Sequence, residues 1–228
     1  MKKKPIVTID GPSGAGKTTV SRELARRLGF SYVDTGALYR GLAVMAKRAG
    51  VAPDDDDGLS GLCQGLTLRF VPGPDGSRLT ANSEDLTDLL RTPEISMMAS
   101  AVSARPVVRR WLLSVQRDLG REGGAVFEGR DMGTVIFPEA DVKFFLSADI
   151  EVRAGRRHLE LMQKGADVSL ASVLADMKKR DQNDSTRAEA PLAQAPDAIF
   201  VDSTRLSADE VVSEMLERVR KRCGLSLR

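Results

Sequence analysis

Apolar residues alternate between two periodicities along most of the chain. Short, continuously apolar stretches typical of buried strands precede segments in which apolar residues recur every three or four positions, as on one helix face. The expected strands cover residues 5–10, 30–34, 125–128, 142–146 and 198–201. The expected helices cover residues 17–28, 37–48, 105–120, 150–163 and 169–180. This alternation predicts an α/β fold with a parallel sheet covered by helices on both faces.

The boundaries of several helices are also marked in the sequence. Gly29 is a natural C-terminal stop for the first helix, and Pro106 is tolerated in the first turn of the helix at 105–120. The residues Ser-Ala-Asp-Glu at 207–210 form a capping box that opens a last helix. The expected inward stripe of that helix consists of Val211, Val212, Met215, Leu216 and Val219.

The pattern changes between residues 62 and 95. Residues 66–71 alternate polar and apolar side chains, as a half-exposed antiparallel strand does. Residues 72–76 read Pro-Gly-Pro-Asp-Gly, which is turn chemistry, and residues 78–81 can return as a second strand. We therefore expect a small antiparallel lobe inserted into the α/β chain.

Size and charge narrow the class of protein. The 228 residues, 42% of them hydrophobic, suffice for one sizeable core with a smaller lobe. The 34 Lys and Arg residues nearly balance the 32 Asp and Glu residues, which gives a formal net charge of +2. A protein that holds a nucleic acid duplex usually shows a clearer basic excess, so this balance does not favour nucleic acid as a partner.

Cysteine usage and hydropathy indicate the compartment. Two cysteines and one histidine cannot form a disulfide framework or a metal site with the usual ligand spacing, which favours a reducing compartment. The apolar run after Lys2-Lys3-Lys4 is too short for a signal peptide and ends on Asp10. No apolar run approaches the roughly 20 residues that span a bilayer. We expect a cytoplasmic protein with no membrane partner.

One loop carries specific chemistry. The segment from Gly11 to Thr18 matches the phosphate-binding pattern G-x-x-x-x-G-K-[ST], between an expected strand and an expected helix. Glycines let main-chain N–H groups turn inward around a phosphate, and the following helix directs its positive end at the same anion. Lys17 can bridge the β- and γ-phosphates of ATP, and the Thr18 hydroxyl can bind Mg²⁺. The predicted ATP-binding residues are Gly11, Pro12, Ser13, Gly14, Ala15, Gly16, Lys17, Thr18 and Thr19.

A P-loop alone does not separate a kinase from a switch GTPase or a motor. The chain has no N-K-x-D-like guanine-reading motif, is short for an ATP-driven machine, and groups arginines where a second phosphorylated substrate could bind. A kinase is therefore favoured. Two alternatives stay open: a P-loop kinase for UMP, shikimate or gluconate, and a nucleotide-dependent regulatory or RNA-binding module. The aromatic content of 4% counts against base stacking on RNA.

The chain resembles the bacterial cytidylate kinase family, relatives of the adenylate and UMP/CMP kinases. The resemblance is carried by residues 9–17, 34–40, 129–138 (Gly-Arg-Asp-Met-Gly-Thr-Val-Ile-Phe-Pro) and 179–187. It implies transfer of the γ-phosphoryl group of ATP to CMP or dCMP, with Mg²⁺, by a protein that we expect to be monomeric. The expected fold is a P-loop NTPase fold with a five-stranded parallel core sheet, a small antiparallel β lobe and an Arg-rich lid.

The resemblance also implies which residues contact the acceptor. Cytosine presents an amino donor beside two acceptors, so its site needs an acceptor group and a cation. The family's base-reading positions fall on Ser100, Arg109 and Asp131. Its ribose contacts fall on Arg180 and Asp184, with Tyr39 close by, and its phosphate contacts on Arg40, Arg130 and Arg187; Thr35 is a further expected substrate-binding residue. Arg180, Asp184 and Arg187 share one side if their helix continues that far.

The implied catalytic residues are Lys17, Arg130, Arg153 and Arg157. Arg153 and Arg157 share a helix face with Arg156, in a lid that by resemblance closes over the transferring group. The expected layout is a core at 1–34, 121–149 and 190–228, an acceptor-binding lobe at about 35–120, and a lid at about 150–189. Glu128 stands where the family pattern has Asp, and we leave it outside the predicted site.

Overall fold

The structure is a computed structural model, which describes residues 4–73 and 76–225. Lys2 and Lys3 of the basic start, and Pro74 and Asp75 of the expected turn, lie outside these residues. The chain divides into two compact units, one formed by residues 1–33 and 122–228 and the other by residues 34–121. Within the described ranges, no helix has the length and apolar character needed to cross a membrane.

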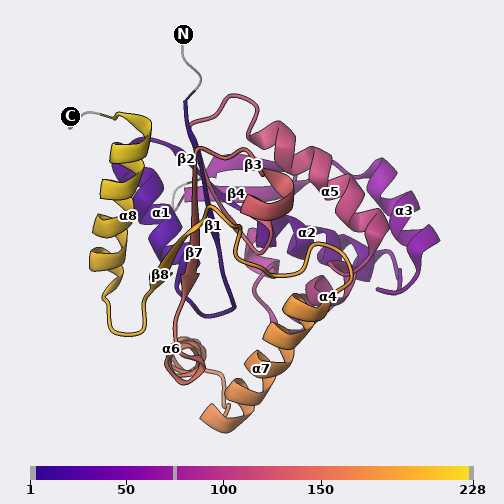
Figure 1. Cartoon of the computed structure of the whole chain (residues 1–228). Coiled ribbons are helices and arrows are strands. Elements are labelled where there is room, and N and C mark those ends of the chain that lie inside the picture. Colours follow the sequence, from indigo (N-terminus) through magenta and orange to yellow (C-terminus); the bar gives the residue numbers. More distant parts are fainter. Residues whose placement is uncertain (1–3, 74–75, 226–228) are drawn as a thin grey trace. The chain divides into compact units, whose positions relative to one another are not determined.

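A five-stranded sheet forms the centre of the first unit (Figure 1). Its strands, in spatial order, are β2 (Ser31–Asp34), β6 (Ala125–Gly129), β1 (Ile6–Asp10), β7 (Val142–Ser147) and β8 (Ile199–Asp202). β1 pairs in parallel with both β6 and β7, and β7 pairs in parallel with β8. All five residues of β1 are buried, as expected for a central strand with helices on both faces. The predicted five-stranded parallel sheet is confirmed.

Helices α1 (Lys17–Leu28) and α8 (Ala208–Cys223) lie side by side against this sheet (Figure 1). Gly29 ends α1 in the left-handed conformation, and the capping box of α8 has both of its hydrogen bonds. The predicted inward stripe of α8 is buried with apolar residues of α1 and the central strands. Helices α6 (Ile150–Gln163) and α7 (Leu170–Thr186) pack together through Ala154, Val173 and Met177.

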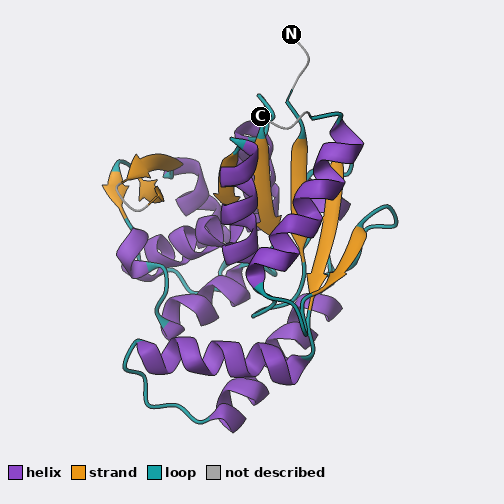
Figure 2. Ribbon diagram, turned by 90° about the vertical axis from the view of Figure 1, so that its left-hand side faces the viewer, coloured by secondary structure: helices purple, strands orange, loops and turns teal. Residues whose placement is uncertain are grey.

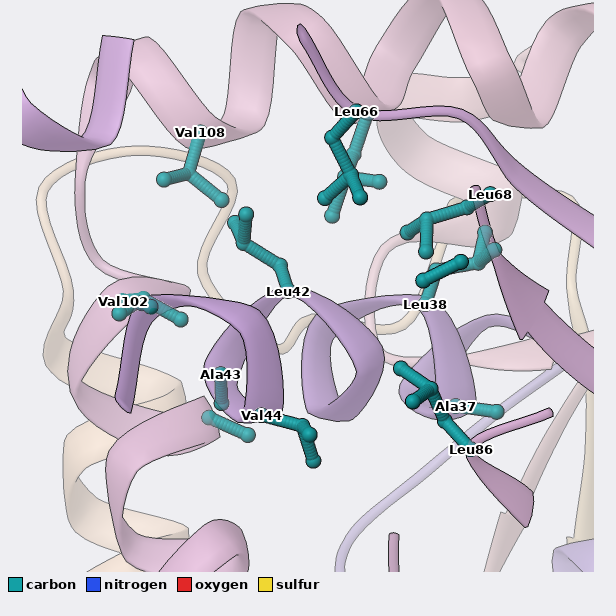
Figure 3. Close-up of a cluster of buried hydrophobic side chains, with 14 of the residues drawn as sticks. Ala37, Leu38, Leu42, Ala43, Val44, Leu66, Leu68, Leu86, Val102 and Val108 are labelled. Atoms are coloured by element: carbon teal, nitrogen blue, oxygen red, sulfur yellow. The ribbon is translucent and has the colours of Figure 1, made fainter. Parts of the chain in front are cut away.

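The second unit combines helices with a small sheet, shown in orange with the larger sheet in Figure 2. Its strands are β3 (Leu68–Gly73), β4 (Gly76–Ala81) and β5 (Glu84–Asp85), and both pairings are antiparallel. Its helices are α2 (Thr35–Arg48), α3 (Asp56–Gly65), α4 (Pro93–Val102) and α5 (Pro106–Leu119), with a 3₁₀ turn at Thr87–Leu89. Figure 3 shows Leu38 and Leu42 of α2 in the apolar core of this unit, with Leu68 and Val108.

Several boundaries differ from the sequence-based expectation. The small sheet spans residues 68–85 rather than 62–95, because residues 62–65 belong to α3 and residues 93–95 to α4. Pairing of β3 with β4 continues to Gly73 and Gly76, so strand geometry extends into the expected turn. Helix α7 begins after Ser169, whose side chain caps it, and continues six residues past Arg180.

Candidate active site

The phosphate-binding loop joins β1 to α1 at the carboxyl edge of the five-stranded sheet. Gly11 and Gly14 have φ values of 147° and 73°, in the region that side chains rarely adopt. A Cβ atom on Gly11 would lie 1.9 Å from the carbonyl oxygen of Leu146, so the loop is packed directly onto β7. Helix α1 begins at Lys17, and its first N–H groups have no partner within the helix. The geometry is that of an anion cradle, and it fits the triphosphate of a nucleotide.

Lys17 lies against this loop and is only 7% exposed. Its Nζ atom donates hydrogen bonds to the carbonyl oxygens of Gly11 (2.8 Å) and Pro12 (2.7 Å). Burial and the nearby Arg130 lower the pKa of Lys17, whereas Glu128 opposes this shift. Because both hydrogen-bond acceptors are neutral, an anion at the cradle would be a strong partner for the ammonium group.

Helices α6 and α7 hold the tip of the same loop. The guanidinium of Arg153 donates to the carbonyl oxygen of Ser13 (2.9 Å) and to the carboxylate of Asp181 (2.6 Å). Asp181 also accepts a hydrogen bond from the Ser13 amide at 3.3 Å. A Cβ atom on Gly14 would lie 2.7 Å from the terminal methyl group of Met177. Helices α6 and α7 and the P-loop are therefore joined by ionic, polar and apolar contacts within one unit.

A buried ion pair connects the Gly-Arg-Asp motif after β6 to helix α7. The Arg130 Nε atom donates to Asp184 at 2.8 Å, and the two side chains are 18% and 9% exposed. Burial alone would raise the pKa of Asp184, but Arg130 and other arginines hold it below the usual value of 3.8. Arg187, at the C-terminal end of α7, donates to Asp131 at 3.4 Å. Helix α7 thus carries Arg180 and Asp184 but ends at Thr186, so Arg187 is the extended C-cap residue directly after the helix.

Arg180 lies on α7 in the first unit, and the remaining predicted acceptor residues lie in the second unit. Arg109 is 7% exposed, and its guanidinium donates to the Tyr39 hydroxyl and the Ser103 carbonyl oxygen, both at 3.3 Å. Arg40 forms an ion pair of 2.7 Å with Asp34, the residue that caps α2. Thr35, the first residue of α2, is buried, and Ser100 lies half-buried on α4.

The other two arginines on this face of α6 differ in their surroundings. Arg156 donates to the carbonyl oxygen of Ser203 at 2.7 Å, in the loop after β8. Arg157 pairs with Glu160 one turn further along α6 at 2.8 Å, and its side chain is 36% exposed. Arg156 therefore ties α6 to the sheet, whereas Arg157 lies at the surface.

Two buried carboxylates near the ends of the central strands lie outside the predicted site: Glu128, which was considered and left out, and Asp10. Glu128 at the end of β6 is 4% exposed and accepts a hydrogen bond from the Tyr32 hydroxyl. The Arg22 guanidinium lies 5.6 Å from the centre of the Tyr32 ring. Asp10, at the end of β1, is also 4% exposed. For Asp10 the available signal was its position at the end of the strand that leads into the P-loop.

One oxygen ligand suited to Mg²⁺ is present at the start of α1. The hydroxyl of the half-buried Thr18 is a hard oxygen donor, as Mg²⁺ prefers. Residues 4–73 and 76–225 contain no group of three or more His, Cys, Asp or Glu side chains arranged to hold a metal ion. This donor set fits a cation that is bound largely through nucleotide phosphates.

Comparison with known proteins identifies the family. The family model described as cytidylate kinase matches residues 7–221 of the chain. The chain belongs to the cytidylate kinase family. A cytidylate kinase from Geobacter sulfurreducens is 55% identical over 217 residues, which cover 95% of this chain and 93% of the relative. A cytidylate kinase from Syntrophotalea carbinolica is 48% identical over 97% of this chain and 94% of its own length. The resemblance noted in the sequence is confirmed, and with it the prediction of a nucleotide-binding phosphotransferase.

A solved structure of similar fold has no stated activity. An uncharacterized protein from Eubacterium ventriosum superposes with a TM-score of 0.52 at 14% identity, covering 96% of this chain and 100% of that chain. At this identity the likeness concerns the fold alone, and function is argued from the site and the family.

Proposed function

We propose that this cytidylate kinase family member transfers the γ-phosphoryl group of ATP directly to CMP or dCMP, without a covalent intermediate. The observation that carries the proposal is the cradle between β1 and α1, with the buried Lys17 ammonium against it. Phosphoryl transfer depends mainly on positioning two phosphates in line and on neutralising their charge. The buried Lys17 ammonium beside the loop supports the donor half of this proposal.

On the donor side, the loop from Gly11 to Thr19 holds the triphosphate of ATP. Lys17 contacts the β- and γ-phosphates, and Thr18 would contribute its hydroxyl to Mg²⁺. When bound, Mg²⁺ neutralises negative charge on the phosphates. Arg153, Arg157 and Arg130 stabilise the charge that spreads over the oxygens of the transferring group. The contact of Arg153 with the Ser13 carbonyl oxygen supports this role, because it joins Arg153 to the P-loop.

On the acceptor side, the residues divide by the part of the nucleotide they recognise. Arginine suits the phosphate because its planar guanidinium can bind two phosphate oxygens. A cation and a hydrogen-bond acceptor suit the ring atoms of cytosine. We assign the base to Ser100, Arg109 and Asp131, the ribose to Thr35, Tyr39, Arg180 and Asp184, and the phosphate to Arg40, Arg130 and Arg187. The ion pairs of Arg130 with Asp184 and of Arg187 with Asp131 support one shared site for these four residues, in which phosphate, ribose and base contacts are neighbours.

The proposal also assigns a role to each segment of the chain. We assign residues 35–120 to acceptor binding and residues 150–189 to a lid, around a core formed by the rest of the chain. The protein works in the cytoplasm as a monomer, without nucleic acid or membrane partners. The near-balance of charges, with a formal net of +2, supports a small-molecule role over nucleic acid binding.

The substitution Lys17→Ala tests the donor site. We expect kcat/KM for CMP to fall at least about 100-fold, since a cation that stabilises the transition state is lost. ADP release would be measured with ATP, Mg²⁺ and each of CMP, dCMP, UMP and AMP. The exposed Lys221→Ala on α8 is the matched control and should behave as the unmodified protein does. Full activity of Lys17→Ala, or faster use of AMP than of CMP by the unmodified protein, would refute the proposal.

A further inference from the structure

Asp10 ends β1 directly before the P-loop and is almost completely buried, with 4% exposure. Its two carboxylate oxygens accept one hydrogen bond each from consecutive main-chain amides, those of Met132 (2.9 Å) and Gly133 (2.8 Å). These amides directly follow Arg130 and Asp131 in the chain. One side chain therefore bonds the strand that leads into the donor cradle to the loop that carries two proposed acceptor contacts.

The segment that Asp10 holds has an unusual conformation. Residues Met132–Ile136 form a single π-helical turn, in which the Asp131 carbonyl oxygen accepts from the amides of Val135 (2.9 Å) and Ile136 (3.2 Å). Single π turns are rare, and the first amides of any helical turn lack partners within it. Asp10 supplies those partners, so the turn is stabilised from outside by a group on a rigid central strand.

The same loop is packed closely against the sheet. A Cβ atom at position 133 would lie 3.1 Å from both the Thr8 hydroxyl and the Lys143 side chain. Lys143 on β7 is 7% exposed and donates to Asp197 at 2.9 Å. The space beneath the loop is filled by these side chains. A change in the Asp10 carboxylate should therefore shift the loop and not the strands beneath it.

We propose that Asp10 is a positioning residue for phosphoryl transfer: it fixes the loop of Arg130 and Asp131 relative to the P-loop, without touching either substrate. The inference rests on the proposed acceptor role of Arg130 and Asp131. Its physical basis is that a misplacement of about 1 Å at a transfer site can cost about 100-fold in rate.

The ionisation of Asp10 gives a second way to test the positioning role. Burial raises the pKa of Asp10 to about 6, while the two amide hydrogen bonds oppose this. The charged groups around it are Asp131, which raises the pKa, Lys17, which lowers it, and Lys143 beneath the same loop. Protonation gives one carboxyl oxygen a hydrogen that faces an amide donor, so the loop should loosen as the pH falls through about 6.

The substitution Asp10→Asn tests the proposal, because it replaces one acceptor oxygen with an NH₂ group that faces a main-chain N–H. We expect KM for CMP to rise about tenfold or more, and the equilibrium affinity for a non-hydrolysable ATP analogue to change less than about threefold. CMP itself titrates near pH 6, so the readout is the ratio of kcat/KM between unmodified protein and variant from pH 5 to 8. This ratio should be largest above pH 6 and shrink below it.

Asp141→Asn is the matched control. Asp141 accepts a hydrogen bond of 2.8 Å from the Ile6 amide at the other end of β1, far along the strand from the loop. This variant should keep the KM values of the unmodified protein. An Asp10→Asn protein with unchanged KM for CMP, or with equal losses for CMP and the ATP analogue, would overturn the positioning role.

A measurement without substrate separates this inference from the proposed function. Amide hydrogen exchange at Met132 and Gly133 should accelerate at least about tenfold in Asp10→Asn and stay unchanged in Asp141→Asn. In the unmodified protein, protection of the same amides, corrected for intrinsic exchange, should fall as the pH drops below about 6. This second measurement uses the unmodified protein, so it does not depend on whether a variant folds. Constant protection from pH 5 to 8 would refute the inference, whereas failure to phosphorylate CMP together with the expected exchange would refute the proposed function and leave only the hold of Asp10 on the loop in place.

Discussion

At the residue scale, the site is built from charges removed from water and satisfied by specific partners. Asp184 illustrates this, because it pairs with Arg130 and lies near further arginines. A buried ion pair adds little net stability, but removal of one member leaves the other charge buried and unpaired. The pair is thus a strict constraint on where Arg130 can lie.

The substitution Asp184→Asn should lower the free energy of unfolding at pH 7 by about 3–5 kcal/mol. Since the folded-state pKa of Asp184 lies below the usual 3.8, its stabilisation is present above that pH and is lost as the pH falls through the folded-state value. The difference between the two proteins should therefore shrink below about pH 4. Urea unfolding from pH 7 to 3 measures it, with the exposed Asp176→Asn of the same helix as control. A difference independent of pH would contradict this account.

At the element scale, local signals in the sequence predicted most strands and helices near the site. The P-loop helix was predicted with its bounds because Gly29 and the apolar spacing agree. Helix α3 was missed, since it contains three glycines and buries only Leu59 and Cys63. Helix α4 was also missed, although Thr92 and Pro93 are ordinary signals for a helix start.

The capping box of α8 gives a test at this scale. The Ser207 side chain accepts from the Glu210 amide, and Glu210 accepts from the Ser207 amide in return. Ser207→Ala should cost about 1 kcal/mol, which for a chain of this size lowers Tm by about 2–4 °C. Ser207→Asp keeps a cap and should restore most of the loss in a thermal scan. Equal Tm values for Ser207→Ala, Ser207→Asp and the unmodified protein would show that the capping box contributes nothing measurable to stability.

At the scale of the whole molecule, the P-loop and the family resemblance indicated the reaction class and fold from sequence alone. The links that hold the site together could not be predicted in the same way. Asp10 and Met132 are 122 residues apart, and Asp181 is 168 residues from Ser13. No local pattern encodes such pairs, because they depend on strand order and on where each helix ends.

The overall charge leads to a prediction at this scale. With a formal net charge of +2, the protein should bind RNA no more tightly than about 10⁻⁴ M at physiological salt, the weak end of non-specific binding. Fluorescence anisotropy with a labelled cytidine-rich RNA would measure this, with and without ATP. A dissociation constant near 1 µM that weakens steeply with added salt would favour a nucleic-acid-binding role.

The order of the strands has a consequence for synthesis on the ribosome. β1 is made first, yet it pairs with β6 and β7, and its first residue Ile6 lies opposite Ala125. At a synthesis rate of about 5–20 residues per second, β6 is made roughly 6–24 s after β1, so β1 lacks its partner strand during this time. Residues 34–121, by contrast, form a compact unit that is continuous in sequence. The nascent chain must therefore keep an apolar first strand from aggregating while this later segment can already fold.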